Sequence, residues 1–299
     1  MPPPIPASVL AALSGDPRGC PARVEAEELS GGTGAATGGV CRLRGEIETG
    51  DGCRRTFRVI AKTVRPLTEG RHAAHAADPQ HWAYWRREPL AYGSGVLPSG
   101  PGLRAPRCYG VAGSTVFMED VPACTEDPHV AAARLGQWHA SSGIPDLPWL
   151  TADQLGQRLA VSVLDWSAVR PDRRAALLWD ARAELVGRLS ALPRVLSHGD
   201  FGSGNLRRHA GDTVVLDWAT LGSAPVGADL AYLALDTLTD LTSDYLSGLG
   251  GRHPAADALF GYRATLALVG SSRIHWMLAA GHRVPAGYLD FVWDARPTL

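Results

Sequence analysis

Short alternating runs of apolar and polar residues fill much of the first 120 positions, and this alternation is typical of half-buried β-strands. Strands are predicted for five such runs, at residues 24–29, 40–48, 55–64, 106–112 and 114–120. The second and third runs are separated by Thr49-Gly50-Asp51-Gly52, and an Asp-Gly pair between alternating runs is a strong hairpin signal. Residues 80–97 have helical composition, although Pro89 must kink or divide a helix there.

After Val121 the apolar positions recur at helical rather than strand spacing. Helices are predicted over residues 131–143, 171–192, 229–246 and 256–281. A loop followed by a hairpin separates the second of these helices from the third, at residues 198–218. The pattern predicts an α+β protein with a sheet-rich part at residues 1–120 and a larger, mainly helical part at residues 121–299.

The composition argues against several classes of protein. The chain has 299 residues, of which 45% are hydrophobic and 20% charged, and its net charge of −1 favours neither nucleic acid nor an anionic membrane as a partner. Its five cysteines form no CxxC pair, so neither a disulfide framework nor a zinc knuckle is predicted. No apolar run reaches membrane-spanning length and the N-terminus lacks a signal-peptide pattern, so we expect a cytoplasmic protein. The oligomeric state stays open.

The stretch HGDFGSGNLRRHAGDTVVLDW, residues 198–218, carries a set of side chains suited to phosphoryl transfer. Asp200 and Asn205 are five residues apart, and a strand-like run delivers Asp217. Transfer of a phosphoryl group to an alcohol needs one carboxylate for the hydroxyl proton and oxygen ligands for Mg²⁺. The alternative for Asp200 and Asn205 is a turn in which both side chains cap the backbone.

Two further residues fit the same chemistry. Lys62 lies in an apolar strand, where its charge is costly to bury unless it is paired. A kinase uses such a lysine on the α- and β-phosphates and holds it with a helix glutamate. Glu88 is the candidate, 26 residues later, and Glu69 is a weaker one. The alternative for Lys62 is a lysine at a sheet edge that reaches water.

A glycine-rich loop at residues 31–39 precedes Lys62 at the interval that a phosphate-covering hairpin needs. Backbone N–H groups at Gly34 can approach phosphate oxygens without a Cβ clash, and the hydroxyls of Ser30 and Thr33 can add donors. The alternative is a flexible surface loop.

The order of these motifs resembles the aminoglycoside phosphotransferase/choline kinase-like family. The resemblance rests on Lys62, Glu88, MED at 118–120, LGQWHA at 135–140, HGDFGSGN at 198–205, LDW at 216–218 and GADLAYL at 227–233. HGD in place of HRD, and LDW in place of DFG, favour this small-molecule branch over protein kinases. The resemblance implies a bilobal protein-kinase-like fold with ATP or GTP in the cleft and Mg²⁺ bound. The division would fall between residues 1–120 and 121–299.

The same resemblance implies roles for single residues. Asp200 would be the catalytic base, with His198 supporting its loop and Asp229 bracing that loop. Magnesium would be bound by Asn205 and Asp217. The remaining nucleotide contacts would come from Lys62, oriented by Glu88, and from the backbone near Glu119–Val121, which would contact the purine.

The expected reaction is transfer of the γ-phosphate to a hydroxyl of a small molecule, such as an aminoglycoside-like or other antibiotic. The alternatives are a kinase acting on Ser or Thr of a biosynthetic peptide, and a non-catalytic nucleotide-binding pseudokinase. Asp236, Asp240 and Asp244 fall at i, i+4 and i+8 of a predicted helix and would share one face. Such a stripe could attract a polycationic acceptor, and its alternative is a solvated face.

Overall fold

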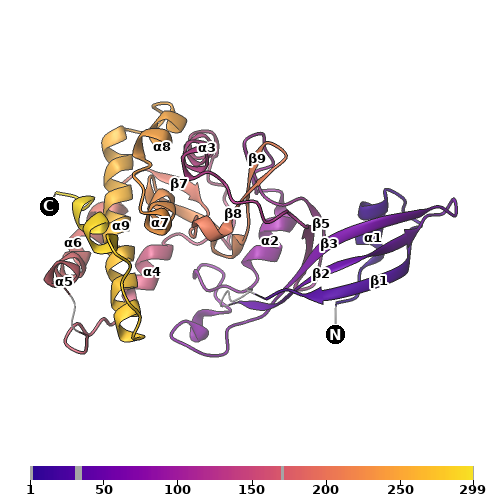
Figure 1. Ribbon diagram of the computed structural model, residues 1–299, viewed down its shortest axis with the longest axis horizontal. Helices are drawn as coiled ribbons and strands as arrows, with labels where there is room; N and C mark the ends of the chain where they lie inside the picture. Colours follow the sequence, from indigo (N-terminus) through magenta and orange to yellow (C-terminus); the bar gives the residue numbers. More distant parts are fainter. Residues whose placement is uncertain (1–2, 31–35, 170–171, 299) are drawn as a thin grey trace.

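The computed structural model describes residues 3–30, 36–169 and 172–298. A curved sheet forms one end of the molecule and a group of helices the other (Figure 1). The sheet has five strands in the order β1-β2-β3-β6-β5, all antiparallel. Their bounds are β1 (Cys20–Glu28), β2 (Thr37–Glu48), β3 (Arg54–Val64), β5 (Cys108–Ala112) and β6 (Thr115–Glu119).

The predicted hairpin joins β2 to β3. Its turn closes through a hydrogen bond from the Gly52 amide to the Thr49 carbonyl at 2.8 Å. Gly52 has a φ of 79°, which glycine adopts without a Cβ clash, so the Asp-Gly signal had a sound physical basis. Helix α1 (Ala7–Ser14) then covers the sheet, where Val9 packs in one apolar cluster with Leu43 and Val59.

The helix predicted over residues 80–97 is shorter than expected, because α2 spans only Arg87–Ser94. Pro89 is its third residue, in the first turn, where the missing N–H has no helical acceptor in any case. Proline therefore neither kinks nor divides this helix. The preceding stretch is folded into turns and a short 3-10 helix, η1 (Ala73–His75).

Two small sheets lie between the large sheet and the helices. One pairs β7 (Arg194–Ser197) with β10 (Gly222–Pro225). The other orders its strands as β4-β9-β8, with bounds β4 (Leu103–Arg104), β8 (Leu206–His209) and β9 (Asp212–Val215). Because β4 pairs with β9, a strand from before residue 120 is hydrogen-bonded to one from well after it. The expected division at residue 120 stays a prediction.

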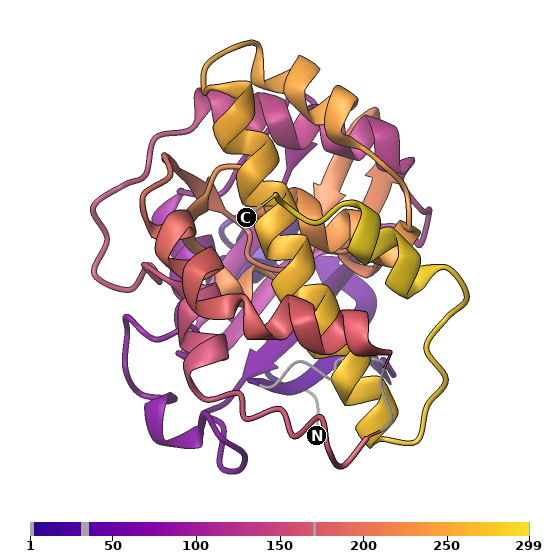
Figure 2. The same ribbon diagram turned by 90° about the vertical axis from the view of Figure 1, so that its left-hand side faces the viewer.

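The rest of the chain is mainly helical. Its helices are α3 (Pro128–Ser141), α4 (Gln154–Ala160), α5 (Arg173–Asp180), α6 (Arg182–Ser190), α7 (Ala228–Thr237), α8 (Thr242–Leu249), α9 (Ala255–Ala279) and α10 (Tyr288–Asp294). Helix α9 runs through this part beside α5 and α10 (Figure 2). Helices α3 and α8 cross closely, because a Cβ on Gly136 would come within 2.2 Å of the Tyr245 carbonyl oxygen. Among the described residues, no helix combines the length and the apolarity that crossing a bilayer requires.

The helix predicted over residues 229–246 is two helices. Helix α7 ends at Thr237, and Leu238 turns the chain with a left-handed φ of 51° before α8 begins at Thr242. The expectation that Asp236, Asp240 and Asp244 share one helix face is therefore wrong. The period of the apolar residues continues through the break and conceals it.

Candidate active site

The HGD segment forms a loop that a buried carboxylate braces. Strand β7 leads into it, and the carboxylate of Asp229, at the start of α7, accepts hydrogen bonds from the amides of His198 (2.8 Å) and Gly199 (2.9 Å) and from the Ser197 hydroxyl (2.8 Å). Gly199 has a left-handed φ of 78°, a conformation that glycine adopts without the strain that a Cβ would cause. The neighbouring imidazole of His139 has its Nε2 3.4 Å from Asp229. Asp229 thus lies where it can brace the loop.

His198 holds the same loop from within. Its Nε2 donates to the carbonyl of Leu216 at 2.9 Å, and its Nδ1 accepts from the amide of Asp200 at 3.2 Å. The ring is fully buried and edge-on to the Trp218 indole. His198 therefore links the segment that carries Asp200 to the segment that carries Asp217.

Asn205 and Asp217 lie on either side of the β8–β9 hairpin. The side-chain amide of Asn205 donates to the Asp200 carbonyl at 2.9 Å, which sets its distance from the predicted base. Asp217 has a left-handed φ of 59°, an uncommon conformation for a residue other than glycine. Such backbone strain is characteristic of functional turns.

Lys62 lies between two carboxylates. One of them is Glu88, the partner that the sequence suggested. The Nζ of Lys62 is 2.7 Å from Glu88 Oε2 and 2.9 Å from Asp217 Oδ1. Burial alone would lower the pKa of the Lys62 ammonium, but the charges of Glu88 and Asp217 outweigh burial and raise it. Burial raises the pKa of the Glu88 carboxyl, whereas for Asp217 the Lys62 charge overcomes burial and lowers it. Lys62 is therefore a cation anchored by α2 and the LDW turn.

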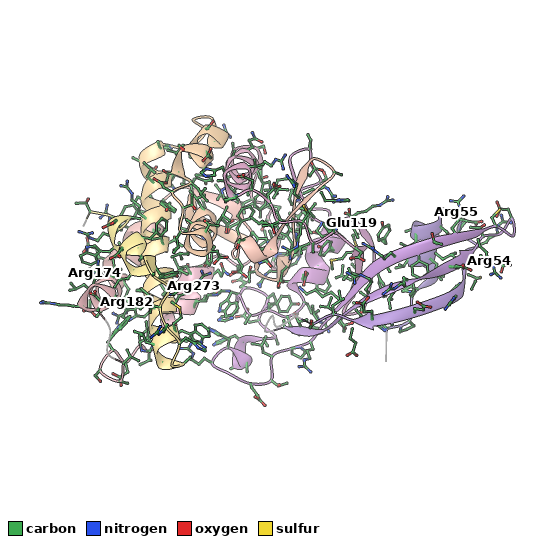
Figure 3. All side chains as sticks on the ribbon, viewed as in Figure 1. Arg54, Arg55, Glu119, Arg174, Arg182 and Arg273 are labelled. Carbon is green, nitrogen blue, oxygen red and sulfur yellow. The ribbon has the colours of Figure 1, made fainter. Side chains whose placement is uncertain are left out.

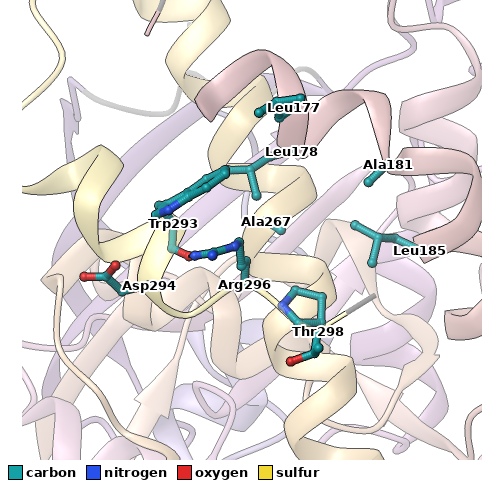
Figure 4. Close-up of a pocket in the computed structure, with 10 residues that line it drawn as sticks. Leu177, Leu178, Ala181, Leu185, Ala267, Trp293, Asp294, Arg296 and Thr298 are labelled. Carbon is teal, nitrogen blue, oxygen red and sulfur yellow. The ribbon is translucent and has the colours of Figure 1, made fainter. Parts of the chain in front are cut away.

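Glu88, Asp200 and Asp217 line one cavity of about 230 Å³. Its lining comes from both parts of the molecule and consists of Ala36, Thr37, Val64, Leu67, Trp82, Ala83, Tyr84, Glu88, Arg158, Asp200, Asp217, Ala219 and Thr220. The predicted base, the predicted metal carboxylate and the lysine's partner thus face one space. A larger cavity of about 540 Å³ lies elsewhere, against Leu178, Trp293 and Arg296, and none of the predicted site residues lines it (Figure 4).

The donor set suits Mg²⁺ in its chemistry. Asp217 offers carboxylate oxygens, and Asn205 has an amide oxygen in addition to the amide nitrogen that it uses on the loop. Hard oxygen donors of this kind are what Mg²⁺ binds. In the part of the chain that the structure describes, no group of three or more His, Cys, Asp or Glu side chains is arranged as a metal site. The Asn205 oxygen and the phosphates of a nucleotide would have to complete the coordination.

The predicted purine-contacting segment follows β6. The carboxylate of Glu119 pairs with Arg104 at 2.6 Å, and its amide donates to the Arg107 carbonyl at 2.8 Å (Figure 3). Its side chain is therefore engaged within the protein. The Val121 amide has no backbone hydrogen-bond acceptor among the described residues, so it is available for a contact with a ligand.

The glycine-rich loop is described only at its ends. Ser30 is exposed where β1 ends, and Thr33 and Gly34 lie outside the described residues. Ala36 and Thr37, at the start of β2, line the cavity. This end of the loop therefore lies where a phosphate-covering hairpin is expected.

The three aspartates of the predicted acidic stripe have separate partners. Asp236 accepts from the Ser203 amide at 3.0 Å and pairs with Arg273 at 2.7 Å. Asp240 caps the start of α8 by accepting from the Thr242 amide at 3.0 Å, and Asp244 contacts His129 at 2.8 Å. Arg273 appears on α9 in Figure 3. Asp236 and Asp244 thus lie beside basic side chains, and Asp240 faces the backbone of α8.

Sequence reasoning missed several residues of this region. Trp82, Tyr84 and Arg158 line the cavity, but none of them belongs to a motif that marks it as a site residue. Arg158 and Trp82 are far apart in sequence and meet only in the folded chain. A single sequence contains no signal for such a contact.

Comparison with known proteins identifies the family. The model of the phosphotransferase enzyme family matches residues 110–268, more than half of the chain. The chain therefore belongs to the phosphotransferase enzyme family, which confirms the aminoglycoside phosphotransferase/choline kinase-like assignment and the α+β fold predicted from the motifs. A search of curated proteins finds no match.

Several solved structures are similar to this chain over most of its length, and the first of them supports the fold. Choline kinase LicA from Streptococcus pneumoniae is 13% identical, with 92% of each chain covered and a TM-score of 0.50. A choline/ethanolamine kinase family protein from Mesorhizobium loti is 15% identical, covering 97% of this chain and 90% of that one, with a TM-score of 0.49. An amicoumacin kinase is also 15% identical, covering 91% of this chain and 86% of that one, with a TM-score of 0.49.

Proposed function

We propose that this phosphotransferase moves the γ-phosphate of ATP or GTP to a hydroxyl group of a small molecule. One observation carries the proposal: Lys62 is held at 2.7 Å from Glu88 and 2.9 Å from Asp217, beside a cavity that Asp200 also lines. Burying a lysine and two carboxylates is unfavourable in free energy, and a role in binding phosphate explains why the protein keeps them there.

The residues fit one balanced step. Asp200 accepts the proton of the acceptor hydroxyl as its oxygen attacks the γ-phosphorus, and the bond from that phosphorus to the leaving diphosphate oxygen breaks. Lys62 binds the α- and β-phosphates, and Glu88 orients Lys62. The hydrogen bond from the Asp200 amide to His198 holds the base in position.

Magnesium is the ion that this donor set fits. Asn205 and Asp217 would hold it, and when bound it neutralises charge on the phosphate oxygens. Candidate acceptors include aminoglycoside-like and other antibiotics, amino alcohols and sugars, and a Ser or Thr hydroxyl of a biosynthetic peptide.

The decisive variant is Asp200→Asn, which keeps the shape of the side chain and removes its basicity. We expect the turnover of nucleotide with an active acceptor to fall by at least about 100-fold, the usual contribution of a general base. Binding of Mg-ATP, measured by calorimetry, should be unchanged. The matched control is Asp146→Asn, because Asp146 is exposed in the loop after α3. Near-normal turnover in Asp200→Asn would refute the mechanism, and wild-type protein with no metal-dependent nucleotide binding would favour a pseudokinase.

A further inference from the structure

Arg158 is a cation at the edge of the candidate active site. It is a partly buried residue of α4 and lines the same cavity as Asp200 and Asp217. Its guanidinium carbon lies 4.3 Å from the centre of the Trp82 ring, in the arrangement of a cation–π contact. The stacking fixes the plane of the guanidinium and leaves its N–H edge available.

Two glutamines of α4 fix the position of Arg158. The side-chain amide of Gln154 donates to the Gly199 carbonyl of the HGD loop at 2.7 Å. Gln157 accepts from the Trp82 amide at 2.8 Å and donates to the Gln80 carbonyl at 3.1 Å. Helix α4 is thus bonded to the loop that carries Asp200 and also to the segment that carries Trp82. A group anchored on both sides is preorganised for a ligand between them.

The charges around the cavity leave Arg158 without a partner. Of the three carboxylates that line the cavity, Glu88 and Asp217 share Lys62, and Asp200 forms no ion pair among the described residues. Within the described ranges, no carboxylate lies within ion-pair distance of Arg158 and no protein acceptor takes a hydrogen bond from its guanidinium. A partly desolvated cation of this kind gains most from an anion supplied by a ligand.

Arg158 and Asp200 line the same cavity, and both charges also act on the nearby phenol of Tyr232. Burial raises the pKa of this phenol, the Arg158 charge opposes that rise, and the Asp200 charge adds to it. Both charges therefore act on one buried hydroxyl. An acceptor whose hydroxyl reaches Asp200 comes close to Arg158.

We propose that Arg158, stacked on Trp82, is an anion-binding subsite for the acceptor and takes a carboxylate or phosphate group of the molecule whose hydroxyl is phosphorylated. The planar N–H edge of arginine matches the two oxygens of such a group. This inference rests on the proposed function and specifies its acceptor as an anionic hydroxyl compound. It replaces the polycationic acceptor suggested by the acidic stripe, whose carboxylates are paired or capping elsewhere.

The test compares related hydroxyl compounds that are neutral, anionic or cationic. Glucose, glucose 6-phosphate and glucosamine form one set, and tyrosol, 4-hydroxyphenylacetate and tyramine form a second. Each probe is titrated by calorimetry into protein saturated with Mg²⁺ and a non-hydrolysable ATP analogue. In at least one set the anionic probe should bind about tenfold or more tightly than its neutral partner, as a charge-assisted hydrogen bond predicts. Equal or tighter binding of the neutral or cationic member in both sets would overturn the proposal.

Substitutions assign the effect to the residue. Arg158→Gln should abolish the preference for the anion, Arg158→Lys should keep part of it, and the affinity for the nucleotide should stay the same. The matched control is Arg174→Gln, which changes a partly exposed arginine of α5 (Figure 3). Arg174 pairs with Asp172 and Asp290 and lines no part of the cavity. If Arg158→Gln weakens nucleotide binding and spares the anion, Arg158 serves the transferred phosphate and the proposal is wrong.

One further variant separates this inference from the proposed function. Asp200→Asn should retain the anion preference while turnover is lost. Anion binding in that variant with full turnover would refute the role of Asp200 but support the subsite. Loss of turnover without any anion preference would support the role of Asp200 and refute the subsite at Arg158.

Discussion

Lys62 shows how a costly side chain is kept in an apolar strand. Its partner in β2 is Val40 and its partner in β6 is Val116, so the ammonium has no polar strand neighbour opposite it. Glu88 is almost completely buried and supplies one counter-charge, and Asp217 supplies the other. Removing one member of a buried ion pair leaves the other as an uncompensated charge.

A double-mutant cycle on Lys62 and Glu88 separates stability from function. Lys62→Met should lower the free energy of unfolding by about 3 kcal/mol, because it leaves the Glu88 carboxylate buried without its cation. Adding Glu88→Gln should restore most of that stability, measured by urea denaturation, since the buried charge is gone. Nucleotide binding should stay lost in the double variant. Recovery of both properties together would contradict a phosphate-binding role for Lys62.

At the scale of elements, the junction of α7 with the HGD loop is a single hydrogen-bonded unit. The two oxygens of Asp229 accept three hydrogen bonds from Ser197, His198 and Gly199. An asparagine has only one acceptor oxygen, so its NH₂ group would face an N–H or O–H donor. The loop that carries Asp200 therefore depends on an ionised side chain from another element.

Asp229→Asn should destabilise the protein by about 2–4 kcal/mol at neutral pH and lower turnover, because the loop loses its acceptors. Burial opposes the shift, but the imidazole of His139 and the hydroxyl of Ser197 help to hold the pKa of Asp229 below its ordinary value. A lowered pKa in the folded state stabilises the protein above the unfolded-state pKa of about 3.9, and this stabilisation is lost as the pH falls through the folded-state value.

Unfolding curves of the wild type and of Asp229→Asn from pH 7 to pH 2.5 test this. The difference in unfolding free energy should be constant above about pH 5 and shrink below it. If the difference in unfolding free energy stays constant down to pH 2.5, ionisation of Asp229 is not what stabilises the wild type.

The helices also show where sequence patterns stop being informative. The capping residue Asp127 and the Pro at the first helical position mark the start of α3, and these signals are local. The break after α7 has no such signal at Leu238, because leucine rarely adopts the left-handed φ that this residue has. The apolar period alone therefore predicted one helix where there are two.

At the scale of the molecule, the candidate site was predictable where its residues lie in a motif. The HGD and LDW motifs predicted Asp200, Asn205 and Asp217, and a buried lysine drew attention to Glu88. Trp82 and Arg158 were not predictable, because their contact depends on a segment before α2 folding across the cavity to reach α4. Long-range placement of this kind follows from tertiary packing and leaves no periodic trace in the sequence.

Arg87 joins the same distant segments. It is fully buried, and its guanidinium donates to five backbone carbonyls, those of Pro79, His81, Trp82, Trp149 and Ala219, at 2.8–3.4 Å. Burial lowers the pKa of Arg87 to about 10, so the side chain stays charged at neutral pH. These carbonyls belong to the turns before α2, to the chain before α4 and to the LDW turn. One side chain thus connects three distant segments, and two of the residues it binds, Trp82 and Ala219, line the cavity.

Arg87→Met should therefore destabilise the fold more than the loss of a single side chain usually does. It leaves several buried carbonyls without donors, and we expect the free energy of unfolding to fall by about 3–5 kcal/mol. Arg87→Lys should recover little, because three tetrahedral N–H donors cannot reach carbonyls arranged around a planar fork. The matched control is Arg86→Met, since Arg86 is the exposed neighbour that stacks on Trp85, and this variant should lower the free energy of unfolding by less than about 0.5 kcal/mol.

Limited proteolysis tests the same role directly. In Arg87→Met it should cut residues 79–86 faster than in the control, because the carbonyls of this segment have lost their hydrogen-bond donor. Equal cleavage rates in the two variants would mean that packing alone holds this wall, and that Arg87 does not connect the parts of the molecule.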